Sequence, residues 1–199
     1  MTLPVEPVVF LILTFIVYWR SLSGPFMFDD RDGVLQNRYV QQCDWISPLH
    51  KHSWRGLTFA SWALNQKLAG VQFSCPQCGL DRTATNPRSL RAVNFVLHTL
   101  NAWHMEQPWI AGLLFVVGPF SVYSVSYITA RASILSAFFA LAGLNLILSG
   151  NELYALPLLL LAFYAKEDGA AFSITYGVVS FLTGGMWWIW ILPPIVLAI

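Results

Sequence analysis

Long runs of apolar residues separated by short polar breaks dominate the chain. After a first run from Leu3 to Trp19 and a long polar stretch, apolar segments lie at roughly 90–103, 108–128, 132–149, 153–165, 170–183 and 186–199. A helix needs roughly 20 apolar residues to cross a hydrocarbon core about 30 Å thick. The pattern therefore predicts about seven transmembrane helices, of which the second and fifth are short.

The apolar runs lack the alternation of membrane barrel strands, and an open sheet would leave backbone groups unpaired in lipid. We therefore expect an all-α polytopic membrane protein. Its predicted parts are a retained transmembrane helix at 1–20, a large loop outside the bilayer at 21–89, and a bundle of about six transmembrane helices at 90–199.

The polar segment has two predicted parts. Apolar residues from Leu57 to Leu68 follow a helical period and include Phe59 and Trp62. This stripe predicts a helix that lies along the membrane surface or dips into it. The stretch from Gln72 to Pro87 has many turn residues and no period, which predicts an inserted loop.

Composition supports a lipid environment, with 56% hydrophobic and 11% charged residues and a mean hydropathy of +0.58. The net charge is +1 without a basic block, which excludes a nucleic-acid partner held through phosphate neutralisation. Nine of the eleven Lys and Arg residues lie between Arg20 and Arg91. The positive-inside tendency weakens for loops of about 60 residues, so charge leaves the orientation open.

Two adjacent carboxylates, Asp29 and Asp30, follow the first apolar run. A carboxylate at the membrane surface is suited to act as a general base on a hydroxyl acceptor. The alternative is that both are solvated loop residues or cap a following helix.

Charged residues also stand at the ends of apolar segments, at Arg131 and at Lys166-Glu167-Asp168. Counting spans places Asp29, Arg131 and Lys166 on one side of the membrane. There Arg55 would supply a bidentate contact to a phosphate and Lys166 a point charge. The alternative is that these charges only end helices at the interface.

Asn94 and His98 lie four residues apart, on one face of the short second apolar segment. Such a pair is more often an interhelical hydrogen bond than a ligand set. A second interpretation makes His98 and His104 axial ligands of a haem.

All three cysteines, Cys43, Cys75 and Cys78, fall in the polar segment. Cys75-Pro-Gln-Cys78 has the spacing of a redox pair or half a zinc site, and His50 and His52 would complete the ligands with Cys43. A disulfide in an oxidising compartment is the other interpretation.

Several short motifs occur in one order along the chain. They are Phe28-Asp29-Asp30 with Asn37, Ser53-Trp54-Arg55-Gly56-Leu57-Thr58 with Asn65, Asn94-Phe95-Val96-Leu97-His98, Gly118-Pro119, Ala130-Arg131-Ala132 and Lys166-Glu167-Asp168-Gly169. In order and spacing this set resembles the amino-terminal part of the transmembrane O-mannosyltransferases that carry tetratricopeptide repeats, which are GT-C membrane glycosyltransferases.

The resemblance implies a multi-pass protein of the ER or bacterial inner membrane whose large loop faces the lumen or periplasm. The implied donor is a polyprenyl-phosphate-linked sugar, held among membrane lipids, with Asp29 or Asp30 as general base on the acceptor. The implied substrate-binding residues are Arg55, Asn94, His98, Arg131, Lys166 and Glu167, of which Arg55, Arg131 and Lys166 would neutralise the leaving lipid phosphate. This scheme requires no metal or cofactor.

The chain also departs from the family pattern. Gly118 to Tyr123 stands where the family has His-Pro-Ile-His-Thr-Glu, Arg91 stands where a histidine is usual, and tetratricopeptide repeats are absent. We therefore expect a truncated or degenerate relative. The competing hypothesis is a non-catalytic subunit of a larger membrane protein complex, which the nine tryptophans would suit.

Overall fold

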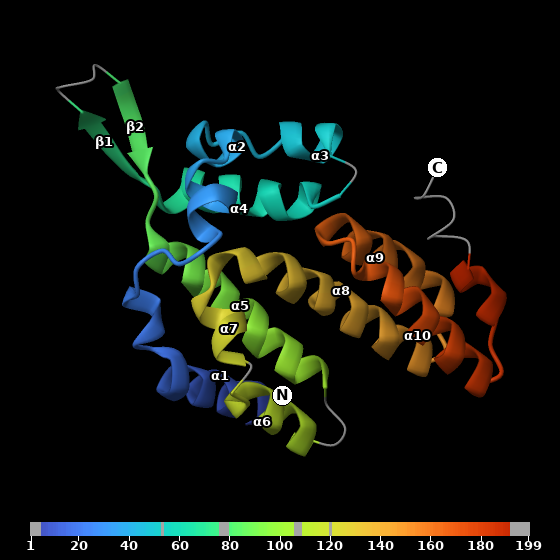
Figure 1. Ribbon diagram of the computed structural model, residues 1–199. Helices are drawn as coiled ribbons and strands as arrows, with labels where there is room; N and C mark the ends of the chain where they lie inside the picture. Colours follow the sequence, from blue (N-terminus) through green and yellow to red (C-terminus); the bar gives the residue numbers. More distant parts are fainter. Residues whose placement is uncertain (1–4, 53, 76–79, 106–108, 120, 192–199) are drawn as a thin grey trace.

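The computed structural model of the chain describes residues 5–52, 54–75, 80–105, 109–119 and 121–191. Helices dominate this part of the chain (Figure 1). The α-helices are α1 (Val5–Tyr18), α2 (Arg38–Gln41), α3 (Ser47–Lys51), α4 (Gly56–Ala69), α5 (Pro87–His104), α6 (Trp109–Val117), α7 (Ser121–Ser126), α8 (Arg131–Leu148), α9 (Glu152–Ala165) and α10 (Gly169–Leu182). Shorter helical turns are η1 (Ser21–Ser23), η2 (Arg31–Leu35), η3 (Ile128–Ala130) and η4 (Trp187–Ile191).

The prediction of about seven transmembrane helices is wrong. Among the described residues, one helical stretch, Ile128–Leu148, is long and apolar enough to cross a membrane. The helices α9 and α10 have 14 residues each. At 1.5 Å per residue this is about 21 Å, shorter than a hydrocarbon core of about 30 Å. The apolar runs at 153–165 and 170–183 gave the bounds of these two helices to within one residue, but helices of this length are too short for the predicted spans.

Three further predicted spans differ from the structure for different reasons. The segment at 108–128 is divided into α6 and α7, which are separated by Gly118 and Pro119. The helix α5 has 18 residues, but it contains buried Arg91, Asn94 and His98, which lower its hydropathy. The last predicted span, at 186–199, begins with the short turn η4, and its residues 192–199 lie outside the described part.

The prediction of an inserted loop over Gln72–Pro87 is wrong for most of its length. Strands β1 (Val71–Cys75) and β2 (Leu80–Ala84) pair antiparallel, with Val71 opposite Ala84 and Cys75 opposite Leu80. The hairpin projects away from the helices (Figure 1). Apolar and polar residues alternate from Val71 to Cys75, which is the period of a strand, and this signal in the sequence was missed.

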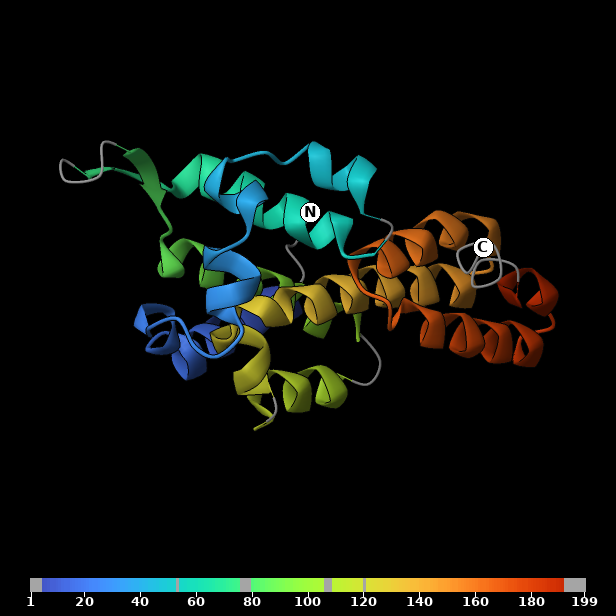
Figure 2. The same ribbon diagram turned by 45° about the horizontal axis from the view of Figure 1, so that its top comes forward.

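The helix α8 is the common packing partner of the bundle. It contacts α5, α9 and α10 along its length and α4 and α7 near its start. In the turned view α8 runs through the middle of the molecule, between the cyan layer of α2–α4 and the red end of the chain (Figure 2). Around its second half, a core of buried side chains joins α8, α9, α10 and η4, built mainly from Ile147, Leu159, Phe163, Tyr176 and Trp190.

The polar segment folds as a layer against the bundle. The helices α2 and α3 pack on α4, and α4 packs in turn on α5, α8 and α9. A second core beneath this layer contains Val34, Val40, Trp62, Leu90 and Ile128. The prediction of a helix over Leu57–Leu68 is confirmed by α4, whereas its placement at a membrane surface stays a prediction.

A close approach of α10 to α8 at Gly143 supplies a stability test. The Tyr176 hydroxyl donates a hydrogen bond to the Ala140 carbonyl at 2.5 Å, and a Cβ at Gly143 would overlap that hydroxyl. We expect Gly143→Ala to lower the free energy of unfolding by about 1–3 kcal/mol, measured by denaturant titration in detergent, because the ring must move in a packed core.

The control for this prediction is Gly177→Ala on α10. A Cβ there would meet its nearest heavy atoms at an ordinary 3.7 Å, so we expect no loss and a gain of up to about 1 kcal/mol from helix propensity. Equal effects of the two substitutions would contradict the close packing of Tyr176 over Gly143.

Candidate functional site

The two adjacent carboxylates have different environments. Asp30 is fully buried, and it accepts hydrogen bonds from the backbone N–H of Met27 at 3.2 Å and of Thr129 at 2.9 Å. Asp29 is exposed, and its backbone N–H donates to the Tyr127 hydroxyl at 3.0 Å. Asp30 thus joins the turn before η2 to the turn before α8. The Asp29 carboxylate has no hydrogen-bond partner among the described residues.

A strained turn presents Asp29 to the surface. The preceding residue, Phe28, has φ of 44° and is 85% exposed. A bulky residue with positive φ is unfavourable and persists only where its surroundings impose it. Its ring lies edge-on to Tyr127, with centroids 6.3 Å apart. Phe28 and Tyr127 therefore form an aromatic wall beside the exposed carboxylate.

Arg131 is a fully buried cation at the start of α8. Its Nε donates to the Asn94 side-chain oxygen at 2.9 Å, and its Nη2 donates to Asn65 Oδ1 at 3.1 Å and to the Leu90 carbonyl. A longer contact of 3.4 Å joins Nη1 to the Ser61 carbonyl. The guanidinium therefore ties α8 to both α4 and α5, and protein acceptors surround it.

Asn94 extends this network towards Asp29. Its Nδ2 donates to the Tyr127 carbonyl at 3.0 Å, while its Oδ1 accepts from Arg131. The hydroxyl of the same Tyr127 receives the Asp29 N–H. The predicted residues Asp29, Asn94 and Arg131 are thus linked through one tyrosine.

Arg91 was not among the predicted site residues. It is fully buried, donates to the carbonyls of Gly24, Pro25 and Ser126, and is close enough to Asp30 for a favourable charge interaction. An arginine at the start of a predicted apolar span is the signal that could have identified it, because such a charge needs partners.

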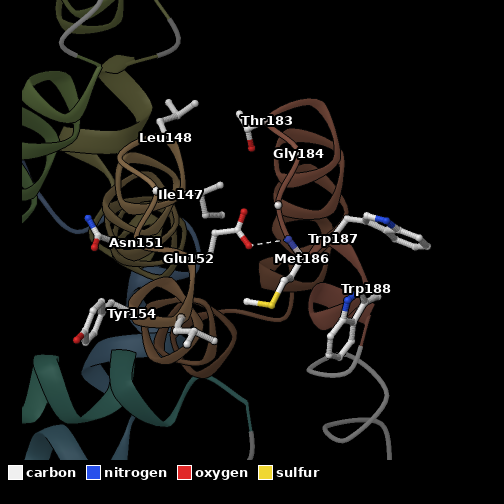
Figure 3. A pocket seen from close by; sticks show the side chains of 13 residues that line it. Ile147, Leu148, Asn151, Glu152, Tyr154, Thr183, Gly184, Met186, Trp187 and Trp188 are labelled. Carbon is white, nitrogen blue, oxygen red and sulfur yellow. Dashed lines mark hydrogen bonds between the residues drawn. The ribbon is translucent and has the colours of Figure 1, made fainter.

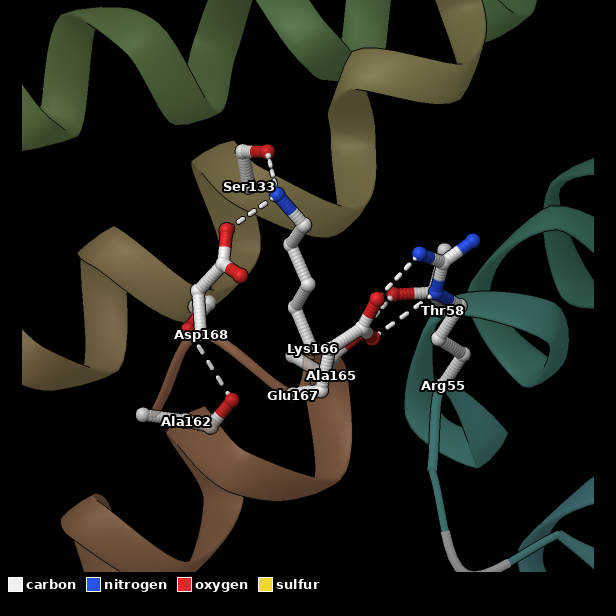
Figure 4. Close-up of polar contacts among 9 residues, drawn as sticks. Arg55, Thr58, Ser133, Ala162, Ala165, Lys166, Glu167 and Asp168 are labelled. Atoms are coloured by element: carbon white, nitrogen blue, oxygen red, sulfur yellow. Dashed lines mark hydrogen bonds and ion pairs between the residues drawn. The ribbon is translucent and has the colours of Figure 1, made fainter. Parts of the chain in front are cut away.

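The Lys166-Glu167-Asp168 turn between α9 and α10 meets both α4 and α8 (Figure 4). Arg55 forms a two-pronged ion pair with Glu167, and Lys166 pairs with Asp168 and donates to Ser133 Oγ at 3.1 Å. The hydrogen bonds from Arg55 lower the pKa of Glu167 from 4.5 to about 2. These charges lie nearer the solvent than Arg131.

The first residues of α8 bring the predicted stretches together. Asp30 accepts a hydrogen bond from the Thr129 N–H, and Arg131 connects α8 with α4 and α5. Ser133 Oγ accepts a hydrogen bond from the Lys166 ammonium. Segments that are 33 to 99 residues apart in sequence therefore meet around Thr129–Ser133. The acidic pair, the buried arginine and the lysine are therefore all attached to the same end of α8.

His98 lies apart from this network. It is buried, stacked on Phe115 with ring centroids 4.5 Å apart and edge-on to Tyr18 at 5.8 Å. Its role as a substrate-binding residue stays a prediction. His104, its proposed partner in a haem site, lies near Asn145 instead, with the Asn145 Nδ2 3.2 Å from His104 Nδ1.

The cysteine hypotheses fall largely outside the described residues. Cys78 is not described, and the side chain of Cys75 is not either. Cys43 has a free thiol. Within the described part, no group of three His, Cys, Asp or Glu side chains is placed to hold a metal ion.

A pocket of about 750 Å³ lies at the opposite end of α8, between the start of α9 and the turn from α10 to η4. There Glu152 accepts hydrogen bonds from Ser180 Oγ and from the Met186 N–H, both at 2.9 Å. Figure 3 shows its carboxylate directed at Met186, with Trp187 and Trp188 on the outer rim. Glu152 was not predicted from sequence, and it holds the two helix ends together.

Three curated proteins are similar to the chain. It is 25% identical to Protein O-mannosyl-transferase F38B6.6 of Caenorhabditis elegans over 173 residues, which cover 79% of the chain. It is 27% and 28% identical to Protein O-mannosyl-transferase TMTC3 of Homo sapiens and of Mus musculus over 150 residues, or 63% of the chain. The chain is distantly related to these O-mannosyl-transferases.

The matched regions are a small part of these relatives. The chain spans 25% of the length of the nematode protein and 15% of each mammalian one. No protein-family model matches the chain. No solved structure matches it either.

The different environments of the two carboxylates predict different effects on stability. We expect Asp30→Asn to lower the free energy of unfolding by about 1–3 kcal/mol, because an amide nitrogen would replace one acceptor of two backbone donors. We expect Asp29→Asn to change it by less than about 0.5 kcal/mol, because that side chain is exposed. Chemical unfolding in detergent tests both, and a larger loss for Asp29→Asn would contradict the assigned roles.

The Arg55–Glu167 pair predicts a pH dependence. Because the pKa of Glu167 is lowered from 4.5 to about 2, the pair stabilises the fold above pH 4.5 and this contribution is lost as pH falls towards about 2. In carboxyl NMR titrations we expect Arg55→Gln to return the Glu167 pKa towards 4.5 and Lys67→Gln to leave it unchanged. A Glu167 that titrates near 4.5 in the unmodified chain would refute the pairing.

Proposed function

We propose that the chain is a glycosyltransferase-like membrane protein that moves a sugar from a polyprenyl phosphate to a hydroxyl acceptor. The observation that carries the proposal is the exposed Asp29 carboxylate, whose backbone N–H is linked through Tyr127 and Asn94 to the buried Arg131 at the start of α8. Lys166 contacts Ser133 at the same end of α8, and Arg55 binds the neighbouring Glu167. The distant similarity to O-mannosyl-transferases supports the same reaction class.

Asp29 takes the role of general base. Its backbone is held by Tyr127, while its carboxylate is exposed and has no hydrogen-bond partner among the described residues. Asp30 is unsuited to this role because its oxygens are buried and occupied by two backbone donors. The adjacent pair thus divides into a reactive and a structural carboxylate.

In the proposed step, the acceptor oxygen bonds to the anomeric carbon and its proton passes to Asp29. The bond between that carbon and the phosphate oxygen breaks, and polyprenyl phosphate leaves with the electron pair. Arg55 and Lys166 have half-exposed and partly exposed side chains, at 47% and 22%. A lipid phosphate would replace Glu167 and Asp168 as their anionic partner, which stabilises the developing charge.

Arg131 and Asn94 act on the reaction as positioning residues in this proposal. Their polar atoms are engaged with one another and with Tyr127, Asn65 and Leu90. The network fixes the start of α8, and with it the tyrosine that holds Asp29.

Outward-facing apolar side chains support association with a membrane. On α1, Ile16 is 62% exposed, and on α10, Ile174 and Leu182 are 71% and 75% exposed. Apolar surface of this extent is normally covered by lipid or protein. In the proposal, the membrane is that of the ER or the bacterial inner membrane, with the 21–89 segment on the luminal or periplasmic side.

A second candidate function is a non-catalytic subunit of a larger membrane complex. Protein acceptors surround the Arg131 guanidinium, and Arg55 and Lys166 already have carboxylate partners. A network of this kind also fits a structural role. Under this alternative, the exposed apolar faces of α1 and α10 contact another membrane protein.

Transfer of labelled sugar tests the proposed function. The purified chain in lipid nanodiscs receives a labelled polyprenyl-phosphate sugar and hydroxyl-bearing peptide acceptors. We expect Asp29→Asn to reduce the transfer rate about 100-fold or more, because general-base catalysis contributes about 10²–10⁴. The matched control is Asp32→Asn, an exposed carboxylate three residues away, which should leave the rate unchanged.

Two outcomes would contradict the enzyme hypothesis. One is a transfer rate that Asp29→Asn leaves unchanged. The other is no transfer by the chain, together with a stoichiometric membrane protein retained after gentle detergent extraction, and this result would favour the subunit.

A further inference from the structure

A shallow pocket of about 420 Å³ lies in the polar layer, between α2, the end of α3 and α4. Its lining combines two cations, a histidine, an amide and two aromatic rings: Arg38, Lys51, His52, Asn37, Tyr39 and Phe59. None of these side chains belongs to the set proposed for sugar transfer. The pocket is therefore a separate candidate site.

Tyr39 organises the pocket from beneath. The ring is buried, Arg38 lies over it with its guanidinium carbon 4.8 Å from the ring centre, and Arg38 Nη2 donates to the Tyr39 hydroxyl at 2.9 Å. The same hydroxyl is 3.1 Å from His52 Nε2. Because a guanidinium only donates, the hydroxyl accepts from Arg38 and its own hydrogen is available to His52.

Stacked aromatic rings hold this arrangement in place. Tyr39 and Phe59 are nearly parallel, with centroids 6.5 Å apart, and the His52 ring is edge-on to both. Asn37 Oδ1 accepts from the Tyr39 N–H at 2.9 Å, which leaves the Asn37 amide nitrogen as a donor. Arg38 is thus pre-ordered at low entropic cost, which favours ligand binding.

The cations of the pocket lack anionic partners within contact distance. Neither Arg38 nor Lys51 forms an ion pair with any residue of the described part, although both are exposed. Asp44 acts on both through its charge, but its Oδ1 is engaged by the Ser47 N–H at 3.0 Å. The pocket therefore keeps an excess of positive charge beside free N–H donors.

We propose that this pocket binds a phosphate group, with Arg38 donating through the guanidinium N–H groups that the Tyr39 hydroxyl leaves free and Lys51 contributing a point charge. A planar guanidinium fork with a neighbouring ammonium is the combination that suits phosphate oxygens. The aromatic wall of Tyr39 and Phe59 takes an adjoining apolar or sugar face of the ligand. The phosphate belongs either to a soluble molecule or to a lipid headgroup.

Inorganic pyrophosphate serves as the soluble probe. The full chain in phosphatidylcholine nanodiscs is titrated by calorimetry at fixed ionic strength. We expect Arg38→Gln to weaken binding about tenfold or more, because it removes charge-assisted hydrogen bonds. Lys51→Gln should weaken binding less, and Lys67→Gln, an exposed lysine of α4 outside the pocket, should leave it unchanged. Circular dichroism checks that each variant is folded.

A second arm distinguishes the two sources of phosphate. The nanodiscs are replaced by phosphatidylcholine or phosphatidylglycerol vesicles, and binding of the detergent-solubilised chain is measured. Stronger binding to phosphatidylglycerol that depends on Arg38, without calorimetric binding of pyrophosphate, supports a lipid headgroup. Pyrophosphate binding that depends on Arg38 supports a soluble phosphate.

The proposal is overturned if neither probe binds, or if Arg38→Gln and Lys51→Gln change binding no more than Lys67→Gln does. The pocket shares no residue with the transfer site. A variant that loses phosphate binding is therefore expected to keep its Asp29-dependent transfer rate. The two hypotheses therefore fail independently.

Discussion

The buried guanidinium of Arg131 is the interaction on which the arrangement of the other helices depends. A charge removed from water is strongly unfavourable unless its donors find acceptors, and these come from side chains and carbonyls of α4 and α5. The helix α8, the polar layer and the helix after the hairpin are therefore fixed relative to one another at one point. Asp30 and Lys166 are attached to the same few residues, through Thr129 and Ser133.

This organisation separates structural from exposed charges within each polar stretch. Asp30 is buried whereas Asp29 is exposed, and Arg131 is buried whereas Arg55 and Lys166 remain near solvent. A buried, saturated charge fixes geometry, and an exposed one with a replaceable partner can meet a ligand. The same division applies in the polar layer, where the buried Tyr39 holds the exposed Arg38.

The proposed activity and the departures from the family pattern concern neighbouring parts of the molecule. Tyr123 occupies the position where the resembling family has a glutamate, and its ring lies 4.6 Å from that of Tyr127, which contacts the Asp29 backbone. If the chain follows the family pattern that its motifs resemble, an aromatic ring stands where a carboxylate is expected, close to the candidate base. This environment fits a transfer reaction that uses one carboxylate. It also fits a structural role in which no carboxylate takes part in chemistry.

The sequence by itself determined that helices would dominate and that α4 would form. It also showed that the charged residues at the ends of the apolar runs are part of short motifs that follow one another in a fixed order. Apolar periodicity and local turn chemistry carry that information, because they act between residues close along the chain. The distinction between Asp29 and Asp30 could not be predicted, because the burial of Asp30 involves the N–H of Thr129, which is distant in sequence, as well as that of nearby Met27.

Tertiary structure alone decided which acceptors surround Arg131 and that Glu152 joins the start of α9 to the turn after α10. The apolar runs gave the bounds of α9 and α10 to within one residue, but they did not give the contacts that hold the helix ends. Thr58 Oγ1 donates to the Ala165 carbonyl at 2.8 Å, and Glu152 accepts a hydrogen bond from the Met186 N–H. The physical reason is that hydrogen bonds of buried groups depend on which partners packing brings within about 3 Å. Partners that are many residues apart leave no periodic trace in the sequence.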